Sequence, residues 1–207
     1  MHEHNHSPQG IDRRTVAKGA AWSLPVLAAA VSAPLAAASP DPTCPECFTA
    51  GSGAAFSAQA VVLGNTGTVA VTTVLNVSTE SCADLSLFQP AYTAIMTAAR
   101  LTMSDGTTYS SALGLGTGAG TFGAISAFNY TGTFSGIPYA NDALPPYGPT
   151  APARLCVDFN MVVVGLPSLL ELTCPVTLCW DVTGQLSTGT VIAGAGTVNH
   201  TGLMTGV

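Results

Sequence analysis

Residues 59–77 decide the fold: Gln59-Ala-Val-Val-Leu63, Gly64-Asn-Thr-Gly67 and Thr68-Val-Ala-Val-Thr-Thr-Val-Leu-Asn-Val77 follow one another. The two outer runs are rich in β-branched residues, which pack well on a pleated, half-buried surface. The four residues between them include two glycines and an asparagine, which tolerate the backbone angles of tight turns. The stretch therefore predicts two antiparallel strands joined as a hairpin.

Further strands are predicted along the chain. Residues 100–110 form a second hairpin pattern, in which Asp105-Gly106 supplies a turn pair that tolerates positive φ. The run from Cys156 to Val164 is apolar on both faces in its second half, which predicts a central strand. Residues 176–183 and 185–193 predict another pair of strands, turned at Gly184.

Three stretches are less regular. Residues 90–99 carry apolar side chains at helical spacing, which predicts a short helix or turn. Residues 114–123 alternate glycine with Leu, Thr and Ala and predict a loop or a Gly-rich strand, since the lysine of a phosphate-binding loop is missing. Residues 141–152 are Pro-rich and predict an irregular loop. Together the patterns predict an all-β, antiparallel β-sandwich, Ig-like or jelly-roll-like, with a barrel as the alternative.

The first 38 residues differ in composition from the rest of the chain. Arg13 and Arg14 are adjacent, Lys18 follows, and residues 19–39 are then uncharged and mostly Ala, Leu and Val. A basic region before an apolar region is the layout of an export signal. Pro25 interrupts the apolar stretch, so no stable membrane span is expected.

The leader ends in a cleavage pattern. Ala36 and Ala38 place small residues at the two positions that a signal peptidase reads, which predicts a cut between Ala38 and Ser39. The chain therefore divides into a helical signal peptide at 1–38, a Pro- and Gly-rich connecting segment at 39–53 and a single β-domain at 54–207.

Asp12-Arg13-Arg14-Thr15-Val16-Ala17-Lys18 resembles the twin-arginine motif, in which Ser or Thr precedes the arginine pair and bulky apolar residues precede the lysine. Asp12 and Ala17 depart from that pattern. The resemblance covers the leader alone. It implies a bacterial protein that the twin-arginine translocase exports in a folded state and a signal peptidase then cleaves.

The net charge of the mature chain limits the kinds of partner that it can bind. Arg100 and Arg154 are its only basic residues, against nine acidic ones, so its net charge is −7 with histidine neutral. Nucleic-acid backbones and anionic membranes attract clusters of Lys and Arg. Both partners are therefore excluded, and a surface protein or a glycan is the expected partner.

All six cysteines follow the predicted cleavage site, which in an exported chain predicts up to three disulfides. The pairing preferred from sequence joins Cys174 to Cys179, Cys82 to Cys156, and Cys44 to Cys47. No cofactor is expected. The alternative is a structural zinc site, because Cys44-Pro-Glu-Cys47 has the spacing of half such a site and the last two cysteines of the chain could complete it. Its ligands would be Cys44, Cys47, Cys174 and Cys179.

Catalytic patterns are weak, and no catalytic residue is assigned. His200 is the single histidine after the leader and is expected on the surface, where it leaves a serine or cysteine nucleophile without a well-placed base. Asp158 with Glu171 or Asp181 could form the carboxylate pair of a glycosidase-like hydrolase.

Aromatic residues concentrate in one part of the mature chain. Exposed rings there could stack on sugars or seat a protein partner, whereas buried rings would build the core. The candidate binding aromatics are Phe128, Tyr130, Phe134, Tyr139 and Tyr147.

These observations predict an exported, non-catalytic β-domain, secreted or at the cell surface, that acts by binding or as an envelope component. The alternative is a secreted hydrolase that uses a carboxylate pair.

Overall fold

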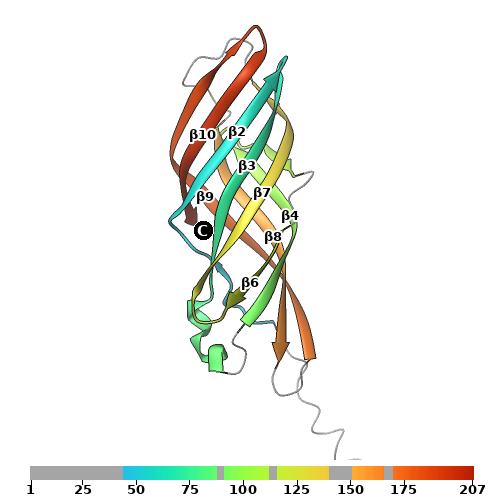
Figure 1. Ribbon diagram of the computed structural model, residues 1–207, viewed down its shortest axis with the longest axis vertical. Helices are drawn as coiled ribbons and strands as arrows, with labels where there is room; N and C mark the ends of the chain where they lie inside the picture. Colours follow the sequence, from blue (N-terminus) through green and yellow to red (C-terminus); the bar gives the residue numbers. More distant parts are fainter. Residues whose placement is uncertain (1–43, 88–90, 112–115, 140–150, 166–169) are drawn as a thin grey trace, which may run out of the picture. The chain divides into compact units, whose positions relative to one another are not determined.

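The hairpin expected at residues 59–77 is formed by β2 (Ala54–Leu63) and β3 (Thr66–Ser78), with Gly64 at positive φ in the turn. The computed structural model describes residues 44–87, 91–111, 116–139, 151–165 and 170–207, which belong to one compact unit beginning at Cys44 (Figure 1).

Strands make up nearly all of this unit. Besides β2 and β3 they are β1 (Thr49–Ala50), β4 (Ala91–Met103), β5 (Thr108–Ser110), β6 (Thr117–Thr121), β7 (Ile125–Pro138), β8 (Pro152–Gly165), β9 (Leu170–Ile192) and β10 (Ala195–Gly206). A short 3₁₀ segment, η1 (Glu80–Leu87), follows β3.

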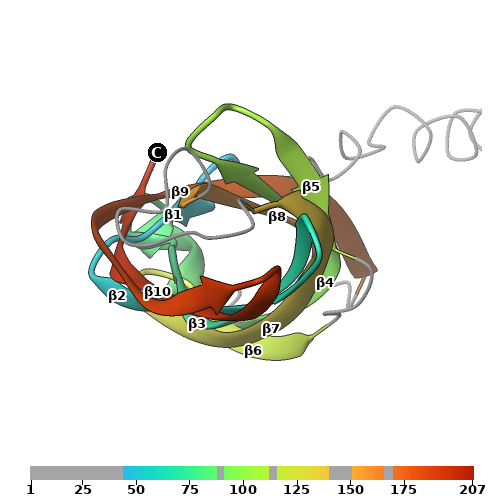
Figure 2. The same ribbon diagram turned by 90° about the horizontal axis from the view of Figure 1, so that it is seen from above.

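The strands form one antiparallel sheet in the order β1-β3-β2-β10-β9-β8-β4-β5, with β7 also paired to β3 and β6 to β4. Seen from above, the sheet curls so that strands far apart in this order face each other across the interior (Figure 2). The prediction of an all-β antiparallel fold is confirmed, and the sandwich-like core lies between opposite parts of one continuous sheet. β8 pairs with both β4 and β9, so the central strand expected at 156–164 is also confirmed.

Strict alternation builds the core. Along β2 and β3, buried and exposed positions alternate almost without interruption, as the two-residue period of a strand requires. The inward positions carry apolar side chains such as Phe56, Val69 and Val71, whereas most outward positions carry Thr, Ser, Ala, Asn or Gln. The inner face is therefore apolar, and the outer face is mainly polar with some exposed aliphatic side chains, such as Leu63.

Four inward-facing glycines make room for aromatic rings. A Cβ on Gly67 would lie 2.9 Å from the Tyr139 ring. A Cβ on Gly118, Gly120 or Gly132 would overlap the rings of Phe128, Tyr92 and Tyr130, respectively. The Gly-rich stretch at 114–123 thus contains a strand, β6, whose glycines face the core, and the loop interpretation does not hold for residues 117–121.

Two predicted elements are wrong. Residues 91–99 belong to β4 instead of a helix, because their inward Tyr92, Ala94 and Met96 pack in the core while both edges of the strand are hydrogen-bonded, to β8 and β6. The turn expected at Gly184 is a bulge inside the single long strand β9, where the pairing with β10 shifts between Thr201 and Leu203.

Among the helical segments in the described ranges, none has the length and apolar character needed to cross a membrane.

The contact between glycine and ring can be tested at Gly120. Replacing Gly120 by Ala should lower the free energy of unfolding by about 1 to 3 kcal/mol, because the new methyl group overlaps the ring of Tyr92 and lies 2.8 Å from Ser126 Oγ. Urea unfolding followed by circular dichroism measures the change. The outward neighbour provides the control, since Ala119→Val adds more bulk on the solvent side of the same strand. Equal stability of both variants would contradict the packing.

Candidate functional site

Three disulfides fasten the described unit. They join Cys44 to Cys174, Cys47 to Cys82, and Cys156 to Cys179. The expectation of three disulfides is confirmed, whereas all three pairings preferred from sequence are wrong. Such cross-links persist in oxidising compartments, so they indicate maturation in an extracytoplasmic environment.

One disulfide joins two paired strands, and the other two join the segment before β1 to later parts of the chain. Cys156 and Cys179 are direct cross-strand partners on β8 and β9, with 4.0 Å between their Cα atoms. Cys44 is bonded to the early part of β9, and Cys47 to η1. The described part of the connecting segment is therefore fixed at two points, to β9 and to η1.

The alternative zinc site required Cys44, Cys47, Cys174 and Cys179 to meet. In the structure these four cysteines belong to three separate disulfides. Cys44 is bonded to Cys174, whereas Cys47 and Cys179 are bonded to cysteines that are not among the proposed zinc ligands. In the described part of the chain, no three His, Cys, Asp or Glu side chains come close enough to hold a metal ion.

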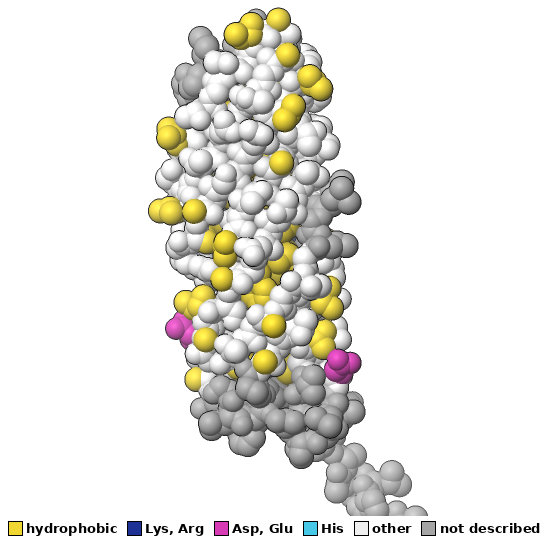
Figure 3. Space-filling model, in the orientation of Figure 1, with side chains coloured by type: hydrophobic (Ala, Val, Ile, Leu, Met, Phe, Trp, Pro, Cys, Tyr) yellow, Lys and Arg dark blue, Asp and Glu magenta, His cyan; other side chains and the backbone are white. Residues whose placement is uncertain are grey.

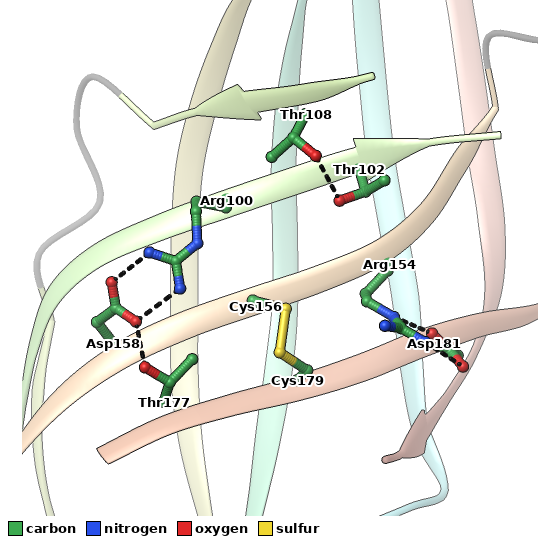
Figure 4. Close-up of a disulfide and its surroundings, with 9 residues drawn as sticks. All are labelled: Arg100, Thr102, Thr108, Arg154, Cys156, Asp158, Thr177, Cys179 and Asp181. Atoms are coloured by element: carbon green, nitrogen blue, oxygen red, sulfur yellow. Dashed lines mark hydrogen bonds and ion pairs between the residues drawn. A yellow bond between two sulfur atoms is a disulfide. The ribbon is translucent and has the colours of Figure 1, made fainter. Parts of the chain in front are cut away.

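The two arginines of the described residues, Arg100 and Arg154, lie on the outer face of β4 and β8, beside the cross-strand disulfide (Figure 4). Arg100 donates two hydrogen bonds to Asp158, of 2.7 and 2.9 Å, and Thr177 donates a third of 2.7 Å. Arg154 donates two to Asp181, of 2.5 and 3.2 Å.

These contacts fix the charge of Asp158. Partial burial alone would raise the pKa of this carboxyl group, but the hydrogen bonds from Arg100 and Thr177 and the guanidinium charge together lower it below its usual value. An ionised carboxylate held by an arginine is a poor proton donor, so Asp158 lacks the property that a glycosidase acid needs.

The candidate carboxylate pairs also lie apart. Asp158 is opposite Thr177, so Asp181 is four residues further along β9, a distance of roughly 13 Å between Cα atoms. Glu171 is six residues away in the other direction, or roughly 20 Å. Paired carboxyl groups in glycosidases are about 5 to 10 Å apart. Asp158 and Asp181 are, in addition, each bound by a different arginine, Arg100 and Arg154, respectively.

His200 is buried, and the expectation of a surface histidine is wrong. Its side chain is 2 % exposed on the inner face of β10. Ser187 Oγ on the neighbouring β9 lies 2.8 Å from Nδ1, and Tyr139 Oη lies 3.1 Å from Nε2. A neutral imidazole donates at one ring nitrogen and accepts at the other, so both contacts can be satisfied together.

Burial also determines the charge of this network. It lowers the pKa of His200 to about 4, because the interior disfavours the imidazolium, and it raises the pKa of the Tyr139 hydroxyl. Near neutral pH all three groups are uncharged. A histidine with this pKa is a weak general base, so we assign the Ser187–His200–Tyr139 network a structural role.

Most of the candidate binding aromatics are in the core. Phe128, Tyr130, Phe134 and Tyr139 are all buried, so they cannot stack on a ligand at the surface. The sequence did contain the signal: the first three lie at even spacing along β7 with Thr, Gly or Asn between them, which is the period of one strand face.

Several candidates lie outside the described residues. They are Tyr147, the leader residues Arg13, Arg14 and Lys18, and the cleavage residues Ala36, Ala38 and Ser39.

Comparison of the chain with family models, with curated proteins and with solved structures finds no match.

The disulfides should differ in their contribution to stability. Replacing Cys44 and Cys174 by serine should cost about 5 kcal/mol, because the bond closes a loop with a sequence separation of 130. The matched pair Cys156→Ser with Cys179→Ser should cost about 3.5 kcal/mol, since its separation is 23. Guanidinium unfolding of the two variants gives the comparison. A larger loss for the second pair would contradict the loop-closure argument.

His200 should make stability depend on pH. Its pKa is about 4 in the folded chain and 6.5 when unfolded, so folding favours the neutral ring. This contribution, about 3 kcal/mol, is complete above pH 6.5 and is lost as the pH falls towards 4. Unfolding free energies measured between pH 7 and 4.5 should show the decline in the wild type and a flatter profile in His200→Gln.

Asp158 does not interfere in that window. Its lowered pKa means that its contribution is present above its ordinary value of 3.8 and is lost only at lower pH. Identical profiles for wild type and His200→Gln between pH 6.5 and 4.5 would show that the buried imidazole is not the responsible group.

Proposed function

We propose that this protein is an exported, non-catalytic β-domain, secreted or retained at the bacterial cell surface, that works through its outer surface as a binding or envelope component. The observation that carries the proposal is the set of three disulfides, which join segments far apart in sequence and use every cysteine of the chain. Bonds of this kind suit an oxidising environment outside the cytoplasm.

The leader supports export of the folded chain by the twin-arginine translocase. Arg13, Arg14 and Lys18 resemble the twin-arginine motif, which implies that the chain folds before it crosses the membrane. Cys44 and Cys174 are 130 residues apart and come together only when β9 takes its place in the sheet. Folding with reduced thiols in the cytoplasm, followed by oxidation outside, is consistent with both features.

The positions of polar groups favour binding over catalysis. The Cα atoms of the residues considered for hydrolysis lie roughly 13 Å or more apart, and the carboxylates of Asp158 and Asp181 each bind an arginine. His200 is enclosed in the core with a low pKa. The outer face, in contrast, carries many exposed hydroxyl and amide groups that remain available to a partner.

Export can be tested with the leader arginines. Replacing Arg13 and Arg14 by Lys should abolish export, so the protein should accumulate in the cytoplasm in precursor form with six free thiols. Cell fractionation with immunoblotting and thiol labelling measures both effects. Arg154→Lys is the matched control, because it makes the same change in the body of the chain and should leave export intact. Export of the double variant at the wild-type level would exclude the twin-arginine route.

A further inference from the structure

The outer face of β2, β3, β10 and the last part of β9 carries no charge. We call the exposed outward side chains in this region, listed below, the neutral face, and each belongs to an aliphatic, hydroxyl or amide residue. They are Ala55, Ser57, Gln59, Val61, Leu63, Thr66, Thr68, Ala70, Thr72, Val74, Leu186, Thr188, Thr190, Ile192, Ala195, Thr197, Asn199, Thr201 and Leu203.

This composition is unusual for a surface in contact with water. Charged residues make up roughly a quarter to a third of the surface of a typical soluble domain. Depletion of charge is instead typical of the centre of protein interfaces. The space-filling view, which looks onto β10, β2, β3 and β7, shows acidic side chains only towards its lower end and no basic ones (Figure 3).

The neutral face is organised in bands. The strand register places Leu63, Ala195 and Ile192 in one row across β2, β10 and β9, and Leu63 and Ile192 are each 71 % exposed. A second apolar row contains Leu203, 56 % exposed, next to Ala55. The two rows are eight residues apart along β2, or roughly 27 Å.

The middle of the face is polar. Gln59 on β2 and Asn199 on β10 are direct partners, and the Gln59 amide donates a 3.1 Å hydrogen bond to Asn199 Oδ1. Ser57, Thr72 and Thr201 lie in the row on one side of this pair, and the β9 member of that row is the exposed Leu186. The row on the other side contains the exposed Val61. Exposed aliphatic side chains therefore lie on both sides of the polar Gln59–Asn199 row, in either direction along the strands.

Charge determines which surface two copies can share. The mature chain has a net charge of −7, and both arginines are already paired with carboxylates. Like-charged copies repel where their acidic groups approach each other. Among the described carboxylates, Glu46, Glu80, Asp105, Asp158 and Glu171 lie off the neutral face. Asp181 borders it, opposite Thr205 on β10, and its charge is paired with that of Arg154.

We propose that the neutral face binds a second copy of the protein, arranged antiparallel about a two-fold axis near Gln59 and Asn199. The Leu63 row of each copy then covers the Leu203 row of the other. A two-fold contact requires a self-complementary surface, and the banding supplies one. The face also offers close to the roughly 20 to 30 residues that one side of a standard interface uses.

A glycan fits this face less well than a second copy does. Sugar-binding surfaces use exposed aromatic rings, whereas no aromatic residue belongs to the neutral face and the nearby Phe128, Tyr130 and Phe134 are buried. Self-association rests on the proposed function, because it names the partner of the outer surface. It is nevertheless measured independently of cellular location.

The test uses oxidised protein purified from cells that produce the full chain. Sedimentation velocity over a range of concentrations should show a monomer–dimer equilibrium. Leu63→Asp and Leu203→Lys should each weaken association at least tenfold, since each inserts an unpaired charge into an apolar contact. The double variant should recover the affinity, because two Asp–Lys pairs then form across the two-fold axis.

Controls separate association from folding and from export. Ile95→Asp places a charge on the exposed face of β4 and should leave the dissociation constant unchanged. Circular dichroism should show the same thermal midpoint for all variants. Three results would overturn the interface: a wild-type protein that stays monomeric at high concentration, association in the single variants equal to wild type, or failure of the double variant to recover. A cytoplasmic location would instead contradict the proposed function and leave this result untouched.

Discussion

The packing of aromatic rings against inward-facing glycines fills the core along the inner face of the sheet. Phe128 on β7 lies against Gly118 of β6, and Tyr92 on β4 lies against Gly120. Any larger residue at these glycines would push the ring, and the strand that carries it, outward. The same relation joins Tyr139 to Gly67, which brings the end of β7 towards β3 and places the tyrosine hydroxyl beside His200. The buried polar network therefore depends on the ring packing.

The sequence predicted those strands that are marked by neighbouring β-branched and turn residues. The hairpin of β2 and β3 was predictable because β-branched runs flank a turn. The first part of β4, residues 91–99, was predicted as a helix because its Ala and Ile residues fit helical spacing, and only pairing with β8 and β6 overrides that preference. A glycine with positive φ occurs in turns and bulges alike, so the sequence around Gly184 does not distinguish the predicted turn from the observed bulge. Both predictions were wrong because the sequence does not show which distant strand pairs with the segment in question.

The same limitation applies to the candidate site. The number of cysteines predicted the disulfides, but their pairing depends on register, as Cys156 opposite Cys179 shows. His200 looked like a surface residue because it lies near the end of the chain, whereas strand alternation places it inside, opposite Ser187. Alternation along β7 could have assigned Phe128 and Tyr130 to the core from sequence, since both share one strand face.

The stability of this fold depends little on which residues occupy its outer surface. The core and three disulfides hold the sheet together, and the described ion pairs lie on the outer face of β4, β8 and β9. Exposed positions on β2, β3 and β10 add little to folding, since surface substitutions away from special features usually change stability by about 0.5 kcal/mol or less. Charge is scarce along the whole chain, in which Asp, Glu, Lys and Arg make up 8 % of the residues, and folding does not require its absence at these positions in particular. In the two-fold contact proposed above, each charge placed on the neutral face would lose its hydration on contact.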